Sequence, residues 1–154
     1  MTRTTAREIA LLLGFSVIAK AETAEECLEQ FFEEEHYASL AEENEAFAEF
    51  PDPRQMEYIR SLVTLIYERQ VELNHYIDKY ATGWKLSRIS KAAGAILRCA
   101  MCEILWMPDV PDAAAINEAV ELAKKYEDEE VVSFINGILG SFVRGEVRTP
   151  EANG

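Results

Sequence analysis

The sequence predicts an all-α fold, and three observations lead to this prediction. Apolar residues recur with a period of about 3.6 residues in most segments, as on the buried face of a helix. No segment alternates apolar and polar residues as a half-buried strand does. Capping residues, prolines and glycines divide the chain into helix-length pieces. With 154 residues, 49% of them hydrophobic, the chain is long enough for one domain with a buried core.

We therefore expect a compact bundle of about seven helices over residues 1–146, followed by a disordered tail over residues 147–154. The first helix should begin at Thr5, where Glu8 completes a capping box, and run to about Lys20. Thr23 and Glu26 repeat this signature and predict the start of a second helix.

Acidic residues are concentrated in one part of the chain. Residues 21–50 contain eleven glutamates and no lysine or arginine, so they contribute −11 of the net charge of −13 and leave −2 for the rest. Residues 79–98 carry five basic residues and no acid. The net charge argues against nucleic-acid binding, because phosphate neutralisation dominates such affinity, but the local charges differ from the average. Residues 33–50 lack a clean period and are expected to form an exposed linker.

The middle of the chain is expected to form one long helix, a short turn or helix, and then another helix. Asp52 is a helix cap followed by a proline, and an apolar stripe predicts a helix from there to about Tyr80, ended by Gly83. Residues 84–89 read as a short turn or helix that supplies core anchors, and residues 90–107 as another helix. The expected anchors of the turn are Trp84, Leu86 and Ile89.

Two further helices follow and form a hairpin. Asp112 is expected to cap a helix over residues 113–126, and Asp128 or Glu129 to start a last helix that ends near Gly145. Inside this last helix, the pattern Asn-Gly-Ile-Leu-Gly places glycines that each cost ~1 kcal/mol relative to alanine. A close crossing of two helices is the simplest reason for them.

No motif in the sequence predicts catalysis, a cofactor or a bound metal. Cys99 and Cys102 form a C-x-x-C pattern, but both lie in mid-helix, where they read as small buried hydrophobic residues. His36 and His75 have no spacing diagnostic of zinc. An odd number of cysteines fits a reducing compartment. Because the chain has neither a signal-peptide cleavage site nor a membrane-length apolar run, we expect a cytoplasmic protein.

Four blocks of sequence together resemble the NusB family of transcription antitermination factors. They are AREIALLLGF (6–15), WKLSRISKAAGAILRCAMCEIL (84–105), DVPDAAAINEAVELAKKY (109–126) and FINGILG (134–140). The resemblance implies an all-helical domain of two packed subdomains. It also implies non-catalytic binding of boxA RNA with the ribosomal protein NusE, as a monomer or homodimer. The complex would be a transcription antitermination complex with RNA polymerase that supports ribosomal RNA transcription.

The candidate RNA-binding residues come partly from the residues themselves and partly from the resemblance. Tyr126 and Phe134 flank a turn beside Lys124 and Lys125, and aromatic rings beside cations can stack unpaired bases, although the rings could also belong to the core. The resemblance adds an N-terminal arginine arm and an acidic position between the two aromatic residues. The full set is Arg3, Arg7, Lys124, Lys125, Tyr126, Glu130 and Phe134.

The resemblance also implies contacts with NusE. An aromatic position that faces NusE corresponds to Phe15, and a charged pair linked to partner contact is replaced here by Ala93 and Gly94. Thr4 and Thr5 stand where further arginines are common, which should weaken RNA binding and its salt dependence.

Two other functions fit parts of the sequence. A protein-interaction module, homodimeric or not, that has weakened or lost RNA binding would fit the acidic segment and the shortened arginine arm. An enzyme that used the cysteine pair would need a thiol with a depressed pKa.

Overall fold

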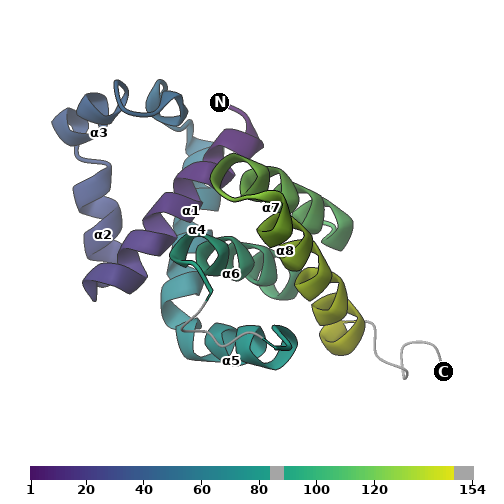
Figure 1. The fold of residues 1–154 in the computed structure, drawn as a ribbon. Coiled ribbons are helices and arrows are strands. Elements are labelled where there is room, and N and C mark those ends of the chain that lie inside the picture. The colour runs from purple at the N-terminus through teal and green to yellow at the C-terminus, as the bar shows by residue number, and fades with distance from the viewer. Residues whose placement is uncertain (84–88, 148–154) are drawn as a thin grey trace. The chain divides into compact units, whose positions relative to one another are not determined.

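The structure, a computed structural model, describes residues 1–83 and 89–147, and the regular secondary structure in these ranges is helical. The described residues form eight α-helices, a short 3₁₀ helix and a π-helical turn, with no strand (Figure 1). The all-α prediction is confirmed. The chain divides into two compact units, unit 1 (Met1–Glu68) and unit 2 (Arg69–Gly154). The predicted tail lies outside the described residues except for Val147.

In unit 1, helix α1 (Arg3–Lys20) packs on α4 (Pro53–Glu68). Their facing stripes are fully buried and include Ile9, Leu13, Ile59 and Leu62. The prediction that α1 begins at Thr5 was wrong. The cap is Thr2, whose hydroxyl accepts from the Thr5 amide at 3.1 Å, so the helix starts before the Thr5–Glu8 signature.

Unit 1 also contains α2 (Ala24–Phe31), α3 (Glu34–Leu40) and the 3₁₀ helix η1 (Glu45–Phe47). The Thr23–Glu26 capping box is present, as predicted. The expected linker over residues 33–50 is instead folded. Its buried Tyr37 and Phe47 lie edge to face with Phe31 of α2, with ring centroids 5.8 and 5.5 Å apart. These aromatic contacts join residues too far apart in sequence for periodicity to show them.

The long helix predicted up to Tyr80 is two helices. Helix α4 ends at Glu68, Arg69 leaves the helical conformation with φ −108° and ψ 17°, and α5 (Gln70–Tyr80) begins unit 2. The apolar stripe does not show the break, because Ile66 and Leu73 on its two sides keep a helical spacing and both are buried.

The predicted stop after α5 is confirmed. Tyr80 is the last helical residue, and Gly83 has a φ of +85°, which favours glycine. Of the core anchors predicted next, Trp84 and Leu86 lie outside the described residues, and Ile89 is half-buried.

The rest of unit 2 is built from three helices that pack on one another: α6 (Lys91–Trp106), α7 (Asp112–Tyr126) and α8 (Glu129–Phe142). The prediction that Asp112 caps α7 was wrong. Asp112 is the first residue of this helix, and Pro111 holds the cap position. Asp128 caps α8, as predicted. Helix α8 ends at Phe142 rather than near Gly145, and a π-helical turn, η3 (Val143–Val147), follows.

The glycines of α8 do not mark a close helix crossing, so that prediction was wrong. Gly137 is exposed, and a Cβ atom built on it would meet no heavy atom within 4 Å. A Cβ on Gly140 would lie 3.3 Å from Nη1 of Arg144, one turn further along the same chain.

Within residues 1–83 and 89–147, no helix combines the length and apolar character needed to cross a membrane.

Candidate nucleic-acid and protein interfaces

The two N-terminal arginines of unit 1 lie against α4 rather than extending into solvent. The Arg3 Nε donates to Oε1 of Gln55 at 2.7 Å, and its guanidinium carbon lies 4.1 Å from the ring centroid of Tyr58. The guanidinium carbon of Arg7 lies 5.6 Å from the same centroid, and Arg7 is only 4% exposed. Cation–π contact with one ring therefore orders both side chains.

Of these two cations, Arg3 is the one that a phosphate can reach more easily, since it is half-buried and Arg7 is buried. Sequence reasoning missed Gln55 and Tyr58, because Tyr58 belongs to the apolar stripe of α4 and reads as an ordinary core residue.

In unit 2, the other five candidate RNA-binding residues lie in the last turn of α7 and the first two turns of α8, on either side of the turn that joins these helices. Lys124 and Lys125 occupy the last turn of α7, and Lys125 Nζ lies 5.7 Å from the ring centroid of Tyr126. Glu130 is exposed in the first turn of α8, and Phe134 follows one turn later. Both aromatic residues are half-buried, so each keeps part of its surface in contact with solvent.

The acidic residues of this turn serve the helix that follows them. The Asp128 carboxylate accepts from the Val131 amide at 3.0 Å, and Glu129 and Glu130 lie in the first turn of α8. Negative charge at a helix N-terminus is stabilised by the helix dipole. On the α7 side, Lys124 Nζ lies 3.0 Å from Oε1 of Glu121, and both side chains are more than half exposed. This exposed pair is weak, so a phosphate can compete for Lys124.

The candidate protein-contact residues differ in what they expose. Phe15 of α1 is 39% exposed, which is unusual for a large apolar side chain in this molecule. Ala93 and Gly94 of α6 are both buried. A Cβ on Gly94 would lie 3.1 Å from Nη1 of Arg98, whose Nε donates to Asn74 Oδ1 at 3.1 Å. The Arg98 guanidinium thus covers position 94, where the resemblance implies a charged side chain and this chain has glycine. Partial burial of this guanidinium lowers the pKa of Arg98.

The three cysteines lie inside the protein. All three are buried, and Cys99 and Cys102 lie in the middle of α6, as predicted. Burial raises the pKa of the Cys102 thiol, whereas a catalytic thiol needs a depressed one. Among the described residues, no three histidine, cysteine or acidic side chains are grouped so that they could hold a metal ion.

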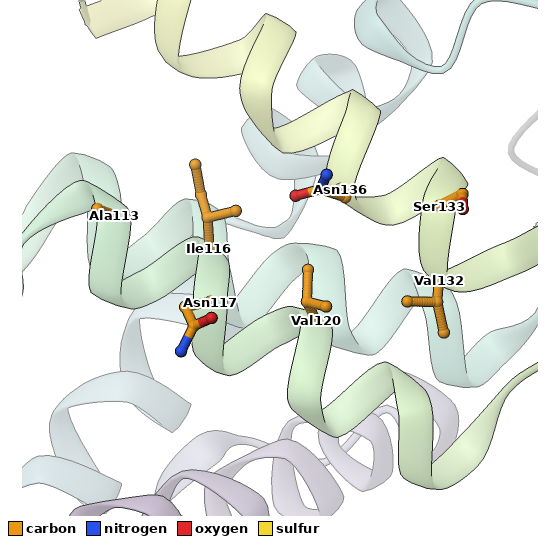
Figure 2. Close-up of a pocket in the computed structure, with 7 residues that line it drawn as sticks. All are labelled: Ala113, Ile116, Asn117, Val120, Val132, Ser133 and Asn136. Carbon is orange, nitrogen blue, oxygen red and sulfur yellow. The ribbon is translucent and has the colours of Figure 1, made fainter. Parts of the chain in front are cut away.

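A shallow groove of about 450 Å³ runs between α7 and α8 in unit 2 (Figure 2). It was not expected from the sequence, although Asn117 and Asn136 belong to the blocks over residues 109–126 and 134–140. Its lining combines aliphatic residues with two asparagines and a serine. Its main lining residues are Ile116, Asn117, Val120, Val132, Ser133 and Asn136. No charged residue lines it, so the groove suits an uncharged group and not a phosphate.

The chain was compared with families of known proteins. The model of the NusB family matches residues 4–144. A transcription antitermination protein NusB from Acetivibrio thermocellus is 39% identical over 153 residues, which cover 99% of this chain and 96% of the relative. A protein of the same name from Clostridium perfringens is 39% identical over 139 residues, 90% of this chain and 94% of the relative.

Solved structures agree in fold. NusB from T. maritima superposes with a TM-score of 0.75 at 27% identity, covering 94% of this chain and 92% of that one. A crystal structure of the antitermination factors NusB and NusE in complex with double-stranded RNA gives a TM-score of 0.74 over 93% of this chain and 96% of that one. At 22% identity, the latter likeness concerns the fold alone. The family match and the relatives lead to one conclusion: the chain belongs to the NusB family.

Proposed function

We propose that this protein is a transcription antitermination factor that binds boxA-type RNA together with the ribosomal protein NusE. It acts without catalysis, in the cytoplasm, within an antitermination complex with RNA polymerase that supports ribosomal RNA transcription. The observation that carries the proposal is the 39% identity, over nearly the whole chain, to a relative named as a transcription antitermination protein. The two compact units act as the two helical subdomains of one NusB domain over residues 1–146.

In this proposal, unit 2 binds RNA through the turn between α7 and α8. Tyr126 and Phe134 are half-buried, so each ring is held by the protein and still offers surface on which a base can stack. Lys124 and Lys125 are exposed beside them and contact phosphates, and Glu130 accepts hydrogen bonds from base edges.

Unit 1 contributes phosphate contacts through its N-terminal arginines. Arg3 contacts a phosphate, and Arg7, buried against the Tyr58 ring, helps to hold Tyr58 and Arg3 in place. Because Thr4 and Thr5 supply no charge, the isolated protein binds RNA weakly, and NusE supplies further contacts.

NusE contacts Phe15 and the surface of α6 near Ala93 and Gly94. Phe15 is 39% exposed and provides an apolar anchor, as aromatic residues often do at interfaces. At Ala93 and Gly94, the group that NusE meets is the Arg98 guanidinium, which lies over Gly94.

The test is a titration of boxA RNA and of a scrambled RNA, each with and without NusE. We expect weak binding of boxA by the protein alone and tighter binding with NusE present. Equal affinities for the two RNAs under both conditions would refute the proposal.

A substitution at Phe134 tests the site itself. Phe134→Ala should weaken boxA binding by about 1–3 kcal/mol, the usual contribution of one stacked base, with little loss of thermal stability. The matched control is Phe50→Ala, which removes an aromatic ring that is 54% exposed in unit 1 and is not a candidate RNA contact. A large loss of stability with unchanged RNA affinity would assign Phe134 to the core.

A second candidate function is a protein-interaction module that has lost RNA binding. It is favoured by the burial of Arg7 and by the acidic segment, which is folded. Light scattering followed by RNA titration separates the two functions, since a dimer that boxA RNA does not dissociate supports the module.

A further inference from the structure

A second groove, of about 370 Å³, lies in unit 1 among α1, α2 and the start of α3. None of the candidate RNA-binding or NusE-binding residues lines it. Its lining residues include Glu22, Gln30, Phe31 and Glu33, together with Lys20 and His36. It therefore combines two acidic residues with an aromatic one, and one lysine and one histidine lie beside them.

The protein holds two of these groups firmly in place. The Phe31 ring lies edge to face with Tyr37 and Phe47, both buried. The Glu33 carboxylate accepts from the backbone amides of Glu35 and His36 at 3.2 and 2.9 Å, which fixes its position at the start of α3. A ligand that binds here therefore meets an ordered wall and an ordered carboxylate, which reduces the entropy lost on binding.

The surroundings of the groove are acidic. Ten of the eleven glutamates of residues 21–50 are exposed, the eleventh (Glu22) is half-buried, and the segment contains no lysine or arginine. Lys20 of α1 and His36 of α3 also line the groove, and within the described residues Lys20 forms no ion pair with Glu22 or Glu33. This charge repels a phosphate backbone and attracts cations.

The residues that line the groove suit the cationic side chain of an arginine. Among the described residues, no three potential metal ligands are grouped so that they could hold a metal ion. An arginine side chain can lay its guanidinium on the Phe31 ring and donate to the two carboxylates. Glutamates spread along α2 and α3 offer further contacts to a chain that carries several such residues.

We propose that this groove docks an arginine of a basic segment of a protein partner, with the guanidinium between Glu22 and Glu33 and against Phe31. This site is separate from the RNA-binding and NusE-binding surfaces proposed above. The proposal also gives the acidic segment (residues 21–50) a role in binding a basic partner. Tyr37 and Phe47 of this segment pack on Phe31, which lines the groove.

The experiment uses the full chain and a capped, fluorescein-labelled peptide in which arginine alternates with glycine. Its control peptide carries citrulline, which keeps the shape of arginine and removes the charge. Binding is followed by fluorescence anisotropy, and the site is located from shifts of the Gln30 and Phe31 backbone amides in NMR spectra. We expect the arginine peptide to bind, to move these amides, and to bind more tightly than the citrulline peptide.

Two double variants of equal charge distinguish the groove from diffuse attraction. Glu22→Gln/Glu33→Gln removes the two carboxylates of the groove and should weaken binding about tenfold, as expected for lost charge-assisted hydrogen bonds. Glu42→Gln/Glu43→Gln removes two exposed charges that do not line the groove and should weaken it less than about twofold. Circular dichroism checks that both variants fold.

A third variant, Phe31→Leu, keeps every charge and should weaken binding about threefold through the lost cation–π contact. Equal weakening by the two double variants, equal binding of the two peptides, or unmoved Gln30 and Phe31 amides would each overturn the proposal. It would also be overturned if an RNA oligonucleotide moved those amides as the peptide does.

Discussion

Replacing Gly137 by alanine should stabilise unit 2, because this glycine weakens α8 without a compensating contact. Gly137 is exposed inside the helix, and a Cβ atom there would meet nothing within 4 Å. The substitution therefore gains helix propensity without a steric cost, and the free energy of unfolding should rise by ~1 kcal/mol. For a unit of this size, that corresponds to an increase in Tm of about 4 °C.

Urea denaturation followed by tryptophan fluorescence measures this change in the correct unit, since Trp84 and Trp106 both belong to unit 2. Gly145→Ala, the same chemical change a few residues later, is the matched control and should destabilise. A Cβ there would lie 2.9 Å from Cζ of Tyr80 and would displace the Tyr80 hydroxyl from its hydrogen bond to Glu146. Destabilisation by Gly137→Ala, or shifts of the same sign for both variants, would refute this reasoning.

Three other predictions concern the core, the end of the last helix and the cysteines. Leu97→Ala should cost ~2–5 kcal/mol of unfolding free energy in urea titrations, because Leu97 is fully buried; a surface-like loss would contradict the packing. The hydrogen bond from Lys79 lowers the pKa of Glu146, so Glu146 stabilises the fold above the ordinary carboxyl range and loses this effect as the pH falls through its lowered pKa. The stability difference between the wild type and Glu146→Gln, measured by thermal melting, should therefore vanish in acid and not in base. Burial raises the pKa of Cys102, so its alkylation at neutral pH should be slower in the native protein than in urea, and equal rates would contradict its burial.

The helices could be predicted from sequence where local signals determine them. Thr23 with Glu26 and Asp128 are caps whose hydrogen bonds span three residues, so the sequence contains all that is needed to recognise them. The break at Arg69 has no such signal, because neither proline nor glycine is present and the apolar stripe continues across it. The folding of residues 33–50 depends on Tyr37 and Phe47 meeting Phe31, which is a tertiary effect.

The candidate site was predictable to a similar degree. The clustering of Tyr126 and Phe134 beside a turn follows from two helices joined by a few residues, and the structure has this arrangement. The burial of Arg7 against Tyr58 does not follow from the sequence, because it depends on how α1 packs on α4. The position of Arg98 over Gly94 does not follow from the sequence either. It depends on the absence of a side chain at Gly94 and on the hydrogen bond from Arg98 to Asn74 of α5.

The few accessible cations limit how much of the proposed RNA affinity can be electrostatic. Arg3, Lys124 and Lys125 are the candidate phosphate contacts that are not buried, and each contact to single-stranded RNA contributes ~0.7 to the slope of log affinity against log salt concentration. The isolated protein should therefore show a slope of about −2 in boxA titrations at several salt concentrations. Most of the affinity must then come from stacking on Tyr126 and Phe134 and from NusE, so a slope steeper than about −4 would contradict this division.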